Sequence, residues 1–343
     1  MNKKKVSAYA PGKMFLIGEY AVVVEHHPAI LLSLNKGVKV SISASDTYSV
    51  NSKKYNAPVE LTYAHKQLTT MDNRYQFTLT IINTFLQLVD HIKPFSVVID
   101  SELDNEKHEK YGLGSSGALI VAMISALSRF FDKNLSLDEI FKLSVIVQLK
   151  LSKYSSFGDL AASTYGGCIY YEKGNVDWVD INDPQSMIHQ PWDGFIIERL
   201  PLKTLDNLVG YSGVRASSTS LVSQVMKIKD TDEFKQFLNE SKKTVMMCKN
   251  SILDKDVESF FFSINKYRDI LLQLQKDSLV QIEIDTIKQM IESTLQLKGV
   301  AKTSGAGGGD CVIAFAKDVD TIKKIKEKWQ DLKIEIISSI KWG

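Results

Sequence analysis

Gly112-Leu113-Gly114-Ser115-Ser116-Gly117 leads directly into a segment that stays apolar nearly all round as far as Phe131. Such a segment predicts a buried helix. A glycine-rich loop that opens into a helix favours an anion, because its backbone N–H groups lie at the positive end of the helix dipole. The two serine hydroxyls add ligands for a phosphate or a metal. The alternative is a tight turn in which a serine caps the helix.

The same six residues satisfy the spacing G-x-G-x-x-G, which is also found in dinucleotide-binding folds. That fold requires a strand between the helix and an acidic residue, whereas Asp132 directly follows the predicted helix and precedes another. No G-x-x-x-x-G-K-[ST] motif occurs in the chain, which argues against a P-loop ATPase. We therefore interpret residues 112–117 as a phosphate loop of another kind.

Two further segments concentrate glycine beside charged residues. The first runs from Pro11-Gly12-Lys13 to Gly18-Glu19-Tyr20, and the second is Lys302-Thr303-Ser304-Gly305-Ala306-Gly307-Gly308-Gly309-Asp310. Lys13 is either a solvated charge or a cation with an anionic partner. The second segment precedes an apolar, β-branched stretch and is either a linker or a binding loop that leads into a strand.

A further candidate is Asp159, which follows the turn-like residues Ser155-Ser156-Phe157-Gly158. Its carboxylate is either a helix cap or a catalytic group. The six histidines show no spacing typical of metal ligands, and we interpret them as structural or exposed. The three cysteines lie far apart, which argues against a disulfide framework and against a zinc site.

Hydrophobic periodicity predicts strands and helices mixed in both halves of the chain without regular alternation, which indicates an α+β fold with two domains. Residues 6–10 and 14–17 are expected to form two strands joined by a turn at Pro11-Gly12. Helices are expected over 77–88, 117–131 and 319–331, with a further helix starting at the Ser136/Glu139 capping box. We place the domain boundary between residues 189 and 190, in a loop-like stretch.

Composition limits the classes of function. The 343 residues are 44% hydrophobic, which is enough for a large core, and carry 42 Lys and Arg against 40 Asp and Glu. A net charge of +2 argues against a nucleic-acid-binding surface. No apolar run reaches the length of a membrane span, and the N-terminal residues lack the apolar core of a signal peptide. We therefore expect a cytoplasmic protein without membrane contact.

Taken in order, the three glycine segments resemble the three motifs of the GHMP kinase superfamily. Within it, Lys302 to Cys311, the run Gly158-Asp159-Leu160-Ala161 and Ala216-Ser217-Ser218 are most similar to the bacterial phosphomevalonate kinase branch. The resemblance implies an N-terminal domain similar to ribosomal protein S5 domain 2 and a ferredoxin-like C-terminal domain, with ATP and acceptor meeting between them. Gly117-Ala118 departs from the two alanines of many relatives.

The resemblance also implies roles for individual residues. Lys13 and Asp159 are the expected catalytic residues, and Gly112 to Gly117 are expected to hold the ATP phosphates. Ser115 or Ser116 is the expected Mg²⁺ ligand, with Glu19 as the candidate carboxylate. The expected substrate-binding residues are Glu19, Tyr20, Lys153, Ser155, Ser156, Ser217, Ser218, Lys302, Ser304, Gly305, Ala306, Gly307 and Gly308. Among them, Gly307 and Gly308 are expected to let the backbone approach the bound phosphates, and Lys302 is expected at the mouth of the third loop, residues 304–309.

The activity implied is transfer of the γ-phosphoryl group of ATP to 5-phosphomevalonate, with no obligate protein partner. Two alternatives stay open at this point. In a mevalonate kinase the acceptor is an alcohol, and Asp159 would act as a general base. A catalytically silent metabolite sensor on the same fold is the alternative outside the enzymes.

Overall fold

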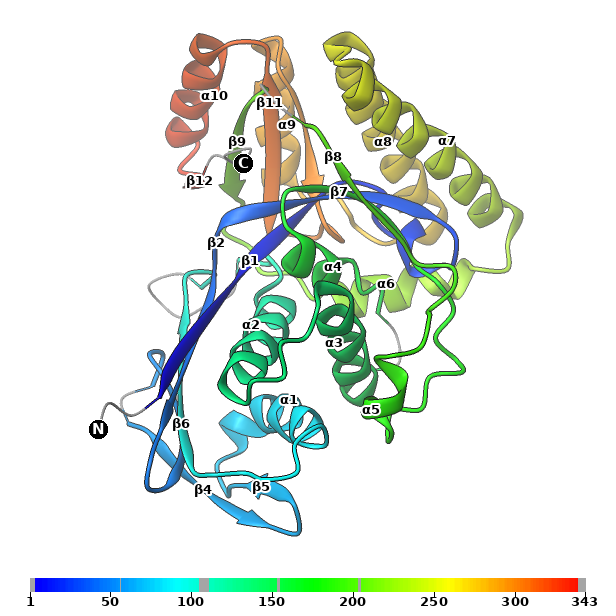
Figure 1. Ribbon diagram of the computed structural model, residues 1–343. Helices are drawn as coiled ribbons and strands as arrows, with labels where there is room; N and C mark the ends of the chain where they lie inside the picture. The colour runs from blue at the N-terminus through cyan, green and yellow to red at the C-terminus, as the bar shows by residue number, and fades with distance from the viewer. Residues whose placement is uncertain (1–3, 56, 105–110, 153–154, 203–204, 339–343) are drawn as a thin grey trace.

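The computed structural model describes residues 4–55, 57–104, 111–152, 155–202 and 205–338. Within these ranges the chain forms two sheets with helices packed against them (Figure 1). The fold is α+β, as the sequence predicts. Lys153, one of the expected acceptor-binding residues, lies outside the described residues.

The larger sheet belongs to the N-terminal part of the chain. Its described strands follow the order β5-β4-β3-β6-β2-β7-β8, with β1 paired to β2, and neighbours are antiparallel except for β3 and β6. Its strands are β1 (Lys5–Ile17), β2 (Pro28–Ala44), β3 (Tyr48–Ser52), β4 (Val59–Ala64), β5 (Gln67–Thr69), β6 (Phe95–Ser101), β7 (Cys168–Glu172) and β8 (Ile196–Leu200).

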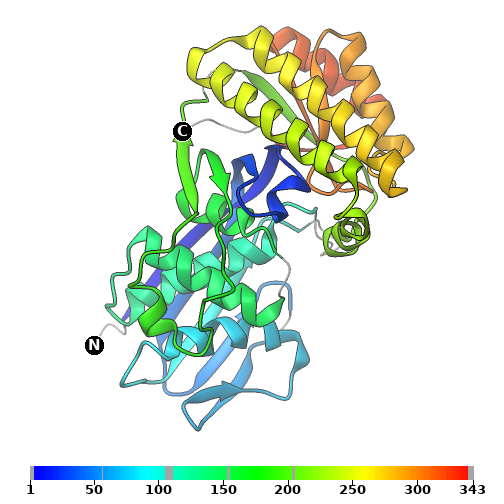
Figure 2. The same ribbon diagram turned by 90° about the vertical axis from the view of Figure 1, so that its right-hand side faces the viewer.

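One face of this sheet is covered by helices. In Figures 1 and 2, α2 lies along β1 and β2, with α1, α3 and α4 grouped around it. These helices are α1 (Gln76–Leu86), α2 (Ser115–Phe130), α3 (Leu137–Leu151) and α4 (Gly158–Tyr165). Short helical turns complete this part: η1 (Ala21–Val23), η2 (Asn73–Tyr75) and α5 (Pro184–Met187).

The smaller sheet has the strand order β10-β11-β9-β12 and is antiparallel. Numbered along the chain, this is the order 2-3-1-4 of a ferredoxin-like sheet. The elements of this part are β9 (Asp206–Tyr211), α6 (Ser218–Val225), η3 (Met226–Ile228), α7 (Asp232–Asp254), α8 (Val257–Ser278), α9 (Asp285–Gln296), β10 (Val300–Ser304), β11 (Cys311–Ala316), α10 (Val319–Asp331) and β12 (Glu335–Ser338).

Two apolar clusters hold these layers together. The larger cluster fills the N-terminal part and continues into α7 and α8, so the two halves share buried surface. The smaller one lies between the second sheet and helices α9 and α10, around the fully buried Trp329. The indole N–H of Trp329 donates to the Met290 carbonyl at 3.0 Å, which satisfies its one polar group.

Most elements lie where hydrophobic periodicity predicts them. The expected helices over 77–88, 117–131 and 319–331 correspond to α1, α2 and α10, and the capping box starts α3. The expected turn at Pro11-Gly12 is wrong, because β1 runs through these residues as one strand. Its pairing with β2 absorbs the interruption as a register shift between Pro11 and Lys13.

The domain boundary after residue 189 stays a prediction. β8 lies beyond it and still pairs with β7, from Cys168 opposite Leu200 to Glu172 opposite Ile196. The second sheet begins with β9. Among the described residues, no helix has the length and apolar character needed to cross a bilayer.

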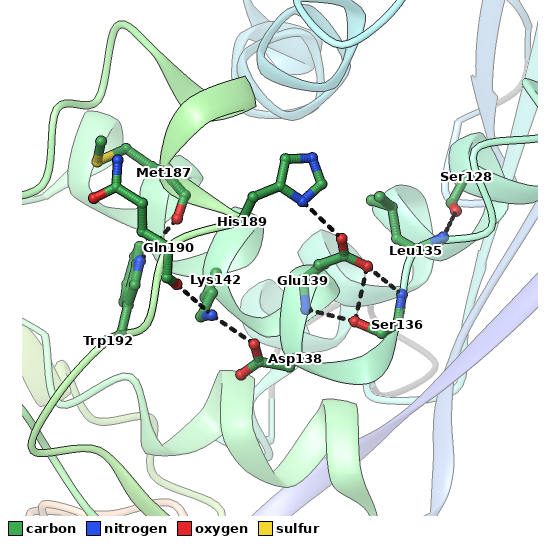
Figure 3. A network of polar contacts seen from close by, with 10 residues as sticks. All are labelled: Ser128, Leu135, Ser136, Asp138, Glu139, Lys142, Met187, His189, Gln190 and Trp192. Atoms are coloured by element: carbon green, nitrogen blue, oxygen red, sulfur yellow. Dashed lines mark hydrogen bonds and ion pairs between the residues drawn. The ribbon is translucent and has the colours of Figure 1, made fainter.

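A polar network fixes the start of α3 and the segment that follows α5 (Figure 3). Ser136 Oγ accepts from the Glu139 amide at 3.2 Å, and Glu139 Oε2 accepts from the Ser136 amide at 2.7 Å. Glu139 also pairs with His189 at 3.0 Å, and Lys142 donates to the Gln190 carbonyl at 2.7 Å. The amide and hydroxyl of Ser136 and the charge of His189 hold the pKa of Glu139 below its usual range.

Ser136→Ala removes the capping acceptor and leaves the Glu139 amide without its partner. We expect a loss of about 1 kcal/mol in the free energy of unfolding, measured by chemical denaturation, with no change in catalytic constants. A wild-type unfolding midpoint would show that the capping box does not stabilise the domain.

Candidate active site

Three glycines of the loop 112–117 each make room for one charged side chain. A Cβ atom on Gly114 would lie 2.9 Å from Lys13 Cγ, and one on Gly117 would lie 2.6 Å from Asp159 Oδ2. A Cβ atom on Gly112 would overlap the carboxyl group of Asp310. The loop therefore collects a lysine and two carboxylates from three distant parts of the chain.

β1 presents Lys13 to this loop. The Lys13 amide donates to the Leu113 carbonyl at 2.9 Å, and a Cβ atom on Gly12 would lie 2.7 Å from the same carbonyl oxygen. Glycine at position 12 thus lets the strand and the loop approach each other. The ammonium group lies 5.1 Å from the centroid of the Phe15 ring and forms no ion pair within the described part of the chain.

Asp159 lies in the first turn of α4 and is partly exposed. Burial raises the pKa of its carboxyl group, and the charge of Lys13 opposes that rise. Asp159 is not the N-cap residue of α4, because that position is Phe157, whose φ is +57°. The hydroxyls of Ser155 and Ser156 accept from the amides of Phe157 and Gly158 and shape the turn before Asp159.

Asp310 is the third charged group; in the sequence it closes the third glycine segment, and with Lys302 it favours a site there over a linker. Only 7% of it is exposed, and its φ is +55°. Burial raises the pKa of its carboxyl, while the Ala216 amide and the charges of Lys13 and Arg215 oppose the rise. Lys13 therefore acts electrostatically on both carboxylates, Asp159 and Asp310.

The start of α2 lies in the middle of this group. Gly114 is the N-cap residue, in the left-handed region (φ +78°), and no side chain caps the helix. The first helical hydrogen bond runs from the Ala118 amide to the Gly114 carbonyl at 3.0 Å. The amides that precede it belong to the first turn, which has no acceptor within the helix, and such amides are suited to an anion.

Three of the expected substrate-binding residues, Glu19, Tyr20 and Lys302, are buried. Lys302 is fully buried and forms an ion pair with Glu19, which is 2% exposed. The expectation that Lys302 lies at the mouth of the third loop is therefore wrong, because its ammonium group is enclosed beneath the loop. Tyr20 donates to the Ala306 carbonyl at 2.5 Å and is also buried. We propose that the three support the loop in place of the expected acceptor contacts.

The third loop itself, residues 304–309, joins β10 to β11 and is tied to its surroundings. Ser304 Oγ accepts from the Phe15 amide at 2.8 Å, and the Gly308 amide donates to the Ile282 carbonyl at 2.8 Å. A Cβ atom on Gly307 would overlap that carbonyl group as well. Gly305 alone in this loop has open space where a Cβ would lie. Contact between this loop and the nucleotide or the acceptor remains a proposal, and Gly305 favours it because the space beside it is open.

Ser217 and Ser218 lie at the start of α6, on the loop that follows β9. Ser217 is the N-cap and accepts from the Ser220 amide at 3.4 Å, and both serines are exposed. The neighbouring Ala216 amide donates to Asp310 Oδ1 at 3.2 Å. This contact connects the two serines to the charged group around the loop 112–117.

The oxygen atoms near the start of α2 fit a hard divalent cation that keeps most of its water ligands. No cluster of three or more His, Cys, Asp or Glu residues with metal-binding geometry occurs among the described residues. Mg²⁺ typically takes one or two protein oxygens and completes its shell with water and phosphate oxygens. The hydroxyls of Ser115 and Ser116, at the start of α2, are oxygens of this kind.

Comparison with known proteins gives matches along nearly the whole chain. The family described as "GHMP kinases N terminal domain" matches residues 77–167, and "GHMP kinases C terminal" matches residues 254–334. A phosphomevalonate kinase of Streptomyces sp. (strain CL190) is 29% identical, over 96% of this chain and 95% of the relative. Mevalonate kinases are among the further relatives.

Solved structures agree with these matches. The Lin0012 protein from Listeria innocua superposes with a TM-score of 0.92 at 31% identity, covering 98% of this chain and 97% of that one. Streptococcus pneumoniae phosphomevalonate kinase in complex with phosphomevalonate and AMPPNP gives a TM-score of 0.84 at 27% identity, covering 98% and 99%.

The buried ion pair predicts a distinct result for Lys302→Met. The substitution leaves the Glu19 carboxylate buried without its cation, which costs about 3–5 kcal/mol of folding free energy. Combining it with Glu19→Gln should recover part of the loss, as measured by urea denaturation. If Lys302→Met instead keeps wild-type stability and raises the KM for the acceptor, Lys302 contacts the substrate, as the resemblance implies.

Proposed function

Because the chain belongs to the GHMP kinase family, we propose that it is a phosphomevalonate kinase, which transfers the γ-phosphoryl group of ATP to the phosphate of 5-phosphomevalonate. The observation that carries this proposal is the approach of Lys13, Asp159 and Asp310 to the three glycines of the loop 112–117. Relatives that bear this activity in their names match over nearly the full chain.

The phosphate groups of ATP lie, in this proposal, against the start of α2. Its first amides and the positive end of its dipole favour an anion there. Gly114 is in the left-handed region at the start of this helix, and the Lys13 side chain packs against it, 2.9 Å from where a Gly114 Cβ atom would lie. Ser115 or Ser116 would hold Mg²⁺, which would supply neutralisation of phosphate charge.

Lys13 stabilises charge on the phosphoryl group in transfer. Phosphoryl transfer depends mainly on positioning and charge neutralisation, so a fixed cation contributes more than a strong base. The acceptor phosphate is already ionised at neutral pH. Asp159 therefore orients Lys13 and the acceptor, a role that suits a carboxylate on which Lys13 acts electrostatically.

The acceptor separates this proposal from its nearest alternative. An alcohol such as mevalonate must lose a proton, which would make Asp159 a general base. ADP release should be measured with 5-phosphomevalonate and with mevalonate at equal concentrations. We expect efficient turnover of the phosphorylated acceptor and poor turnover of mevalonate; the reverse preference indicates a mevalonate kinase, and no turnover of either indicates a silent sensor.

We also propose a cytoplasmic location without an obligate partner. Cys168, Cys248 and Cys311 are free and buried, and burial raises the pKa of each thiol. Buried thiols of raised pKa are unreactive, which suits a reducing compartment.

Lys13→Met tests the stabilisation of transferred charge. We expect kcat to fall by roughly 10² to 10³, with nucleotide affinity largely kept, because one fixed electrostatic contact is lost in the transition state. Lys39→Met, an exposed lysine on β2, is the matched control and should leave kcat unchanged. Near-wild-type turnover of Lys13→Met would remove Lys13 from the mechanism.

Asp159→Asn separates orientation from folding. We expect kcat to fall at least about 10²-fold, because the charge that orients Lys13 is removed. Since burial raises the folded-state pKa of Asp159, its ionised form disfavours folding above that pKa. The variant should therefore unfold at the same temperature as the wild type or higher at neutral pH, and the difference should vanish as the pH falls through this pKa. A lower unfolding temperature with unchanged kcat would assign Asp159 a structural role.

A further inference from the structure

The loop between β9 and α6 forms two hydrogen bonds with Asp310, one through the residue before Arg215 and one through the residue after it. The Asp310 amide donates to the Val214 carbonyl at 2.7 Å, and Asp310 Oδ1 accepts from the Ala216 amide at 3.2 Å. A Cβ atom on Gly309 would overlap the Val214 carbonyl group, so the loop is pressed against the third glycine segment. The residue held between these contacts is Arg215.

Arg215 is an exposed cation. Within the described ranges its guanidinium forms no hydrogen bond or ion pair. Its charge nevertheless acts on the Asp310 carboxyl, as does that of Lys13. Two cations, Lys13 on β1 and Arg215 on the β9–α6 loop, thus oppose the rise in the pKa of the Asp310 carboxyl.

The acceptor phosphate needs such a cation. It carries about −1.5 to −2 charges at neutral pH, and an unmatched anion beside the two carboxylates would bind poorly. Lys302 is enclosed and paired with Glu19, and Lys153 lies outside the described residues. Lys13 is already assigned to the transferred group. Among the described residues, Arg215 is an exposed cation whose neighbours Val214 and Ala216 contact Asp310.

We propose that Arg215 binds the phosphate of the acceptor and that Asp310 is the residue that positions it. This inference rests on the proposed function and adds the source of its selectivity for a phosphorylated acceptor. A guanidinium matches a phosphate in two parallel hydrogen bonds, which a lysine cannot provide. Ser217 and Ser218, next along the loop, orient the acceptor with their hydroxyls.

Arg215→Gln is the first test, with kinetics measured for each substrate separately. We expect the KM for 5-phosphomevalonate to rise by roughly tenfold to a hundredfold, the effect of losing a charge-assisted contact. The KM for ATP should stay within about twofold, because the proposed contact is made to the acceptor. Arg215→Lys should recover only part of the loss. Lys227→Gln, an exposed cation on η3, is the matched control and should change neither KM.

Asp310→Asn tests the positioning role. The asparagine oxygen can still accept from the Ala216 amide, so a merely structural role predicts wild-type constants. We expect the KM for 5-phosphomevalonate to rise, and kcat to fall because Lys13 loses one of its carboxylates. The double variant with Arg215→Gln should raise this KM by less than the product of the two single effects. Multiplicative effects would show that Asp310 does not position Arg215.

The outcomes separate the two proposals. A wild-type enzyme that uses 5-phosphomevalonate, together with an unchanged acceptor KM in Arg215→Gln, overturns the inference and leaves the proposed function intact. A wild-type enzyme that phosphorylates mevalonate, and binds no 5-phosphomevalonate by calorimetry, overturns both. A raised acceptor KM confined to Arg215 and Asp310 variants supports both.

Discussion

The close approach of charged side chains to a backbone without Cβ atoms constrains the whole candidate site. Lys13 on β1 occupies the space that a side chain at Gly114 would take. Asp159 on α4 does the same at Gly117, and Asp310, before β11, at Gly112. β1 must therefore run through Pro11 and Gly12 unbroken, and α4 must start where it does. The second sheet must also bring Asp310 back to the first domain.

A buried ion pair holds these two parts of the molecule together. Lys302 on β10 and Glu19 after β1 lie beneath the third glycine segment, and the Tyr267 hydroxyl donates to the Glu19 carbonyl at 2.9 Å. Buried pairs contribute little net stability compared with apolar packing, but they tolerate few arrangements of their surroundings. The pair thus restricts how the end of β1 and β10 lie against each other, and Glu19 also accepts from the Gly305 amide of the third glycine segment.

Local sequence patterns were sufficient to predict most helices and strands, but not the contacts between residues far apart in the chain. The apolar periodicity of α2 and α10 and the capping box of α3 depend on neighbouring residues, and they were predicted correctly. The strand through Pro11 was missed because only its pairing with β2 keeps it extended. Lys302 was expected at the loop surface, since its burial depends on Glu19, 283 positions away. Arg215 had no local signal, because its relation to Asp310 exists only in the folded chain.

The most direct measurement of the central claim is amide hydrogen exchange of residues 112–118 in the free protein and with Mg²⁺ and AMPPNP. The amides of Ser115 and Gly117 precede the first helical hydrogen bond, which the Ala118 amide donates, so they should exchange rapidly in the free protein. If the loop cradles the nucleotide phosphates, these amides should become strongly protected on binding, while those in the middle of α10 stay unchanged. Saturating nucleotide that protects other segments and leaves residues 112–118 unchanged would contradict the account.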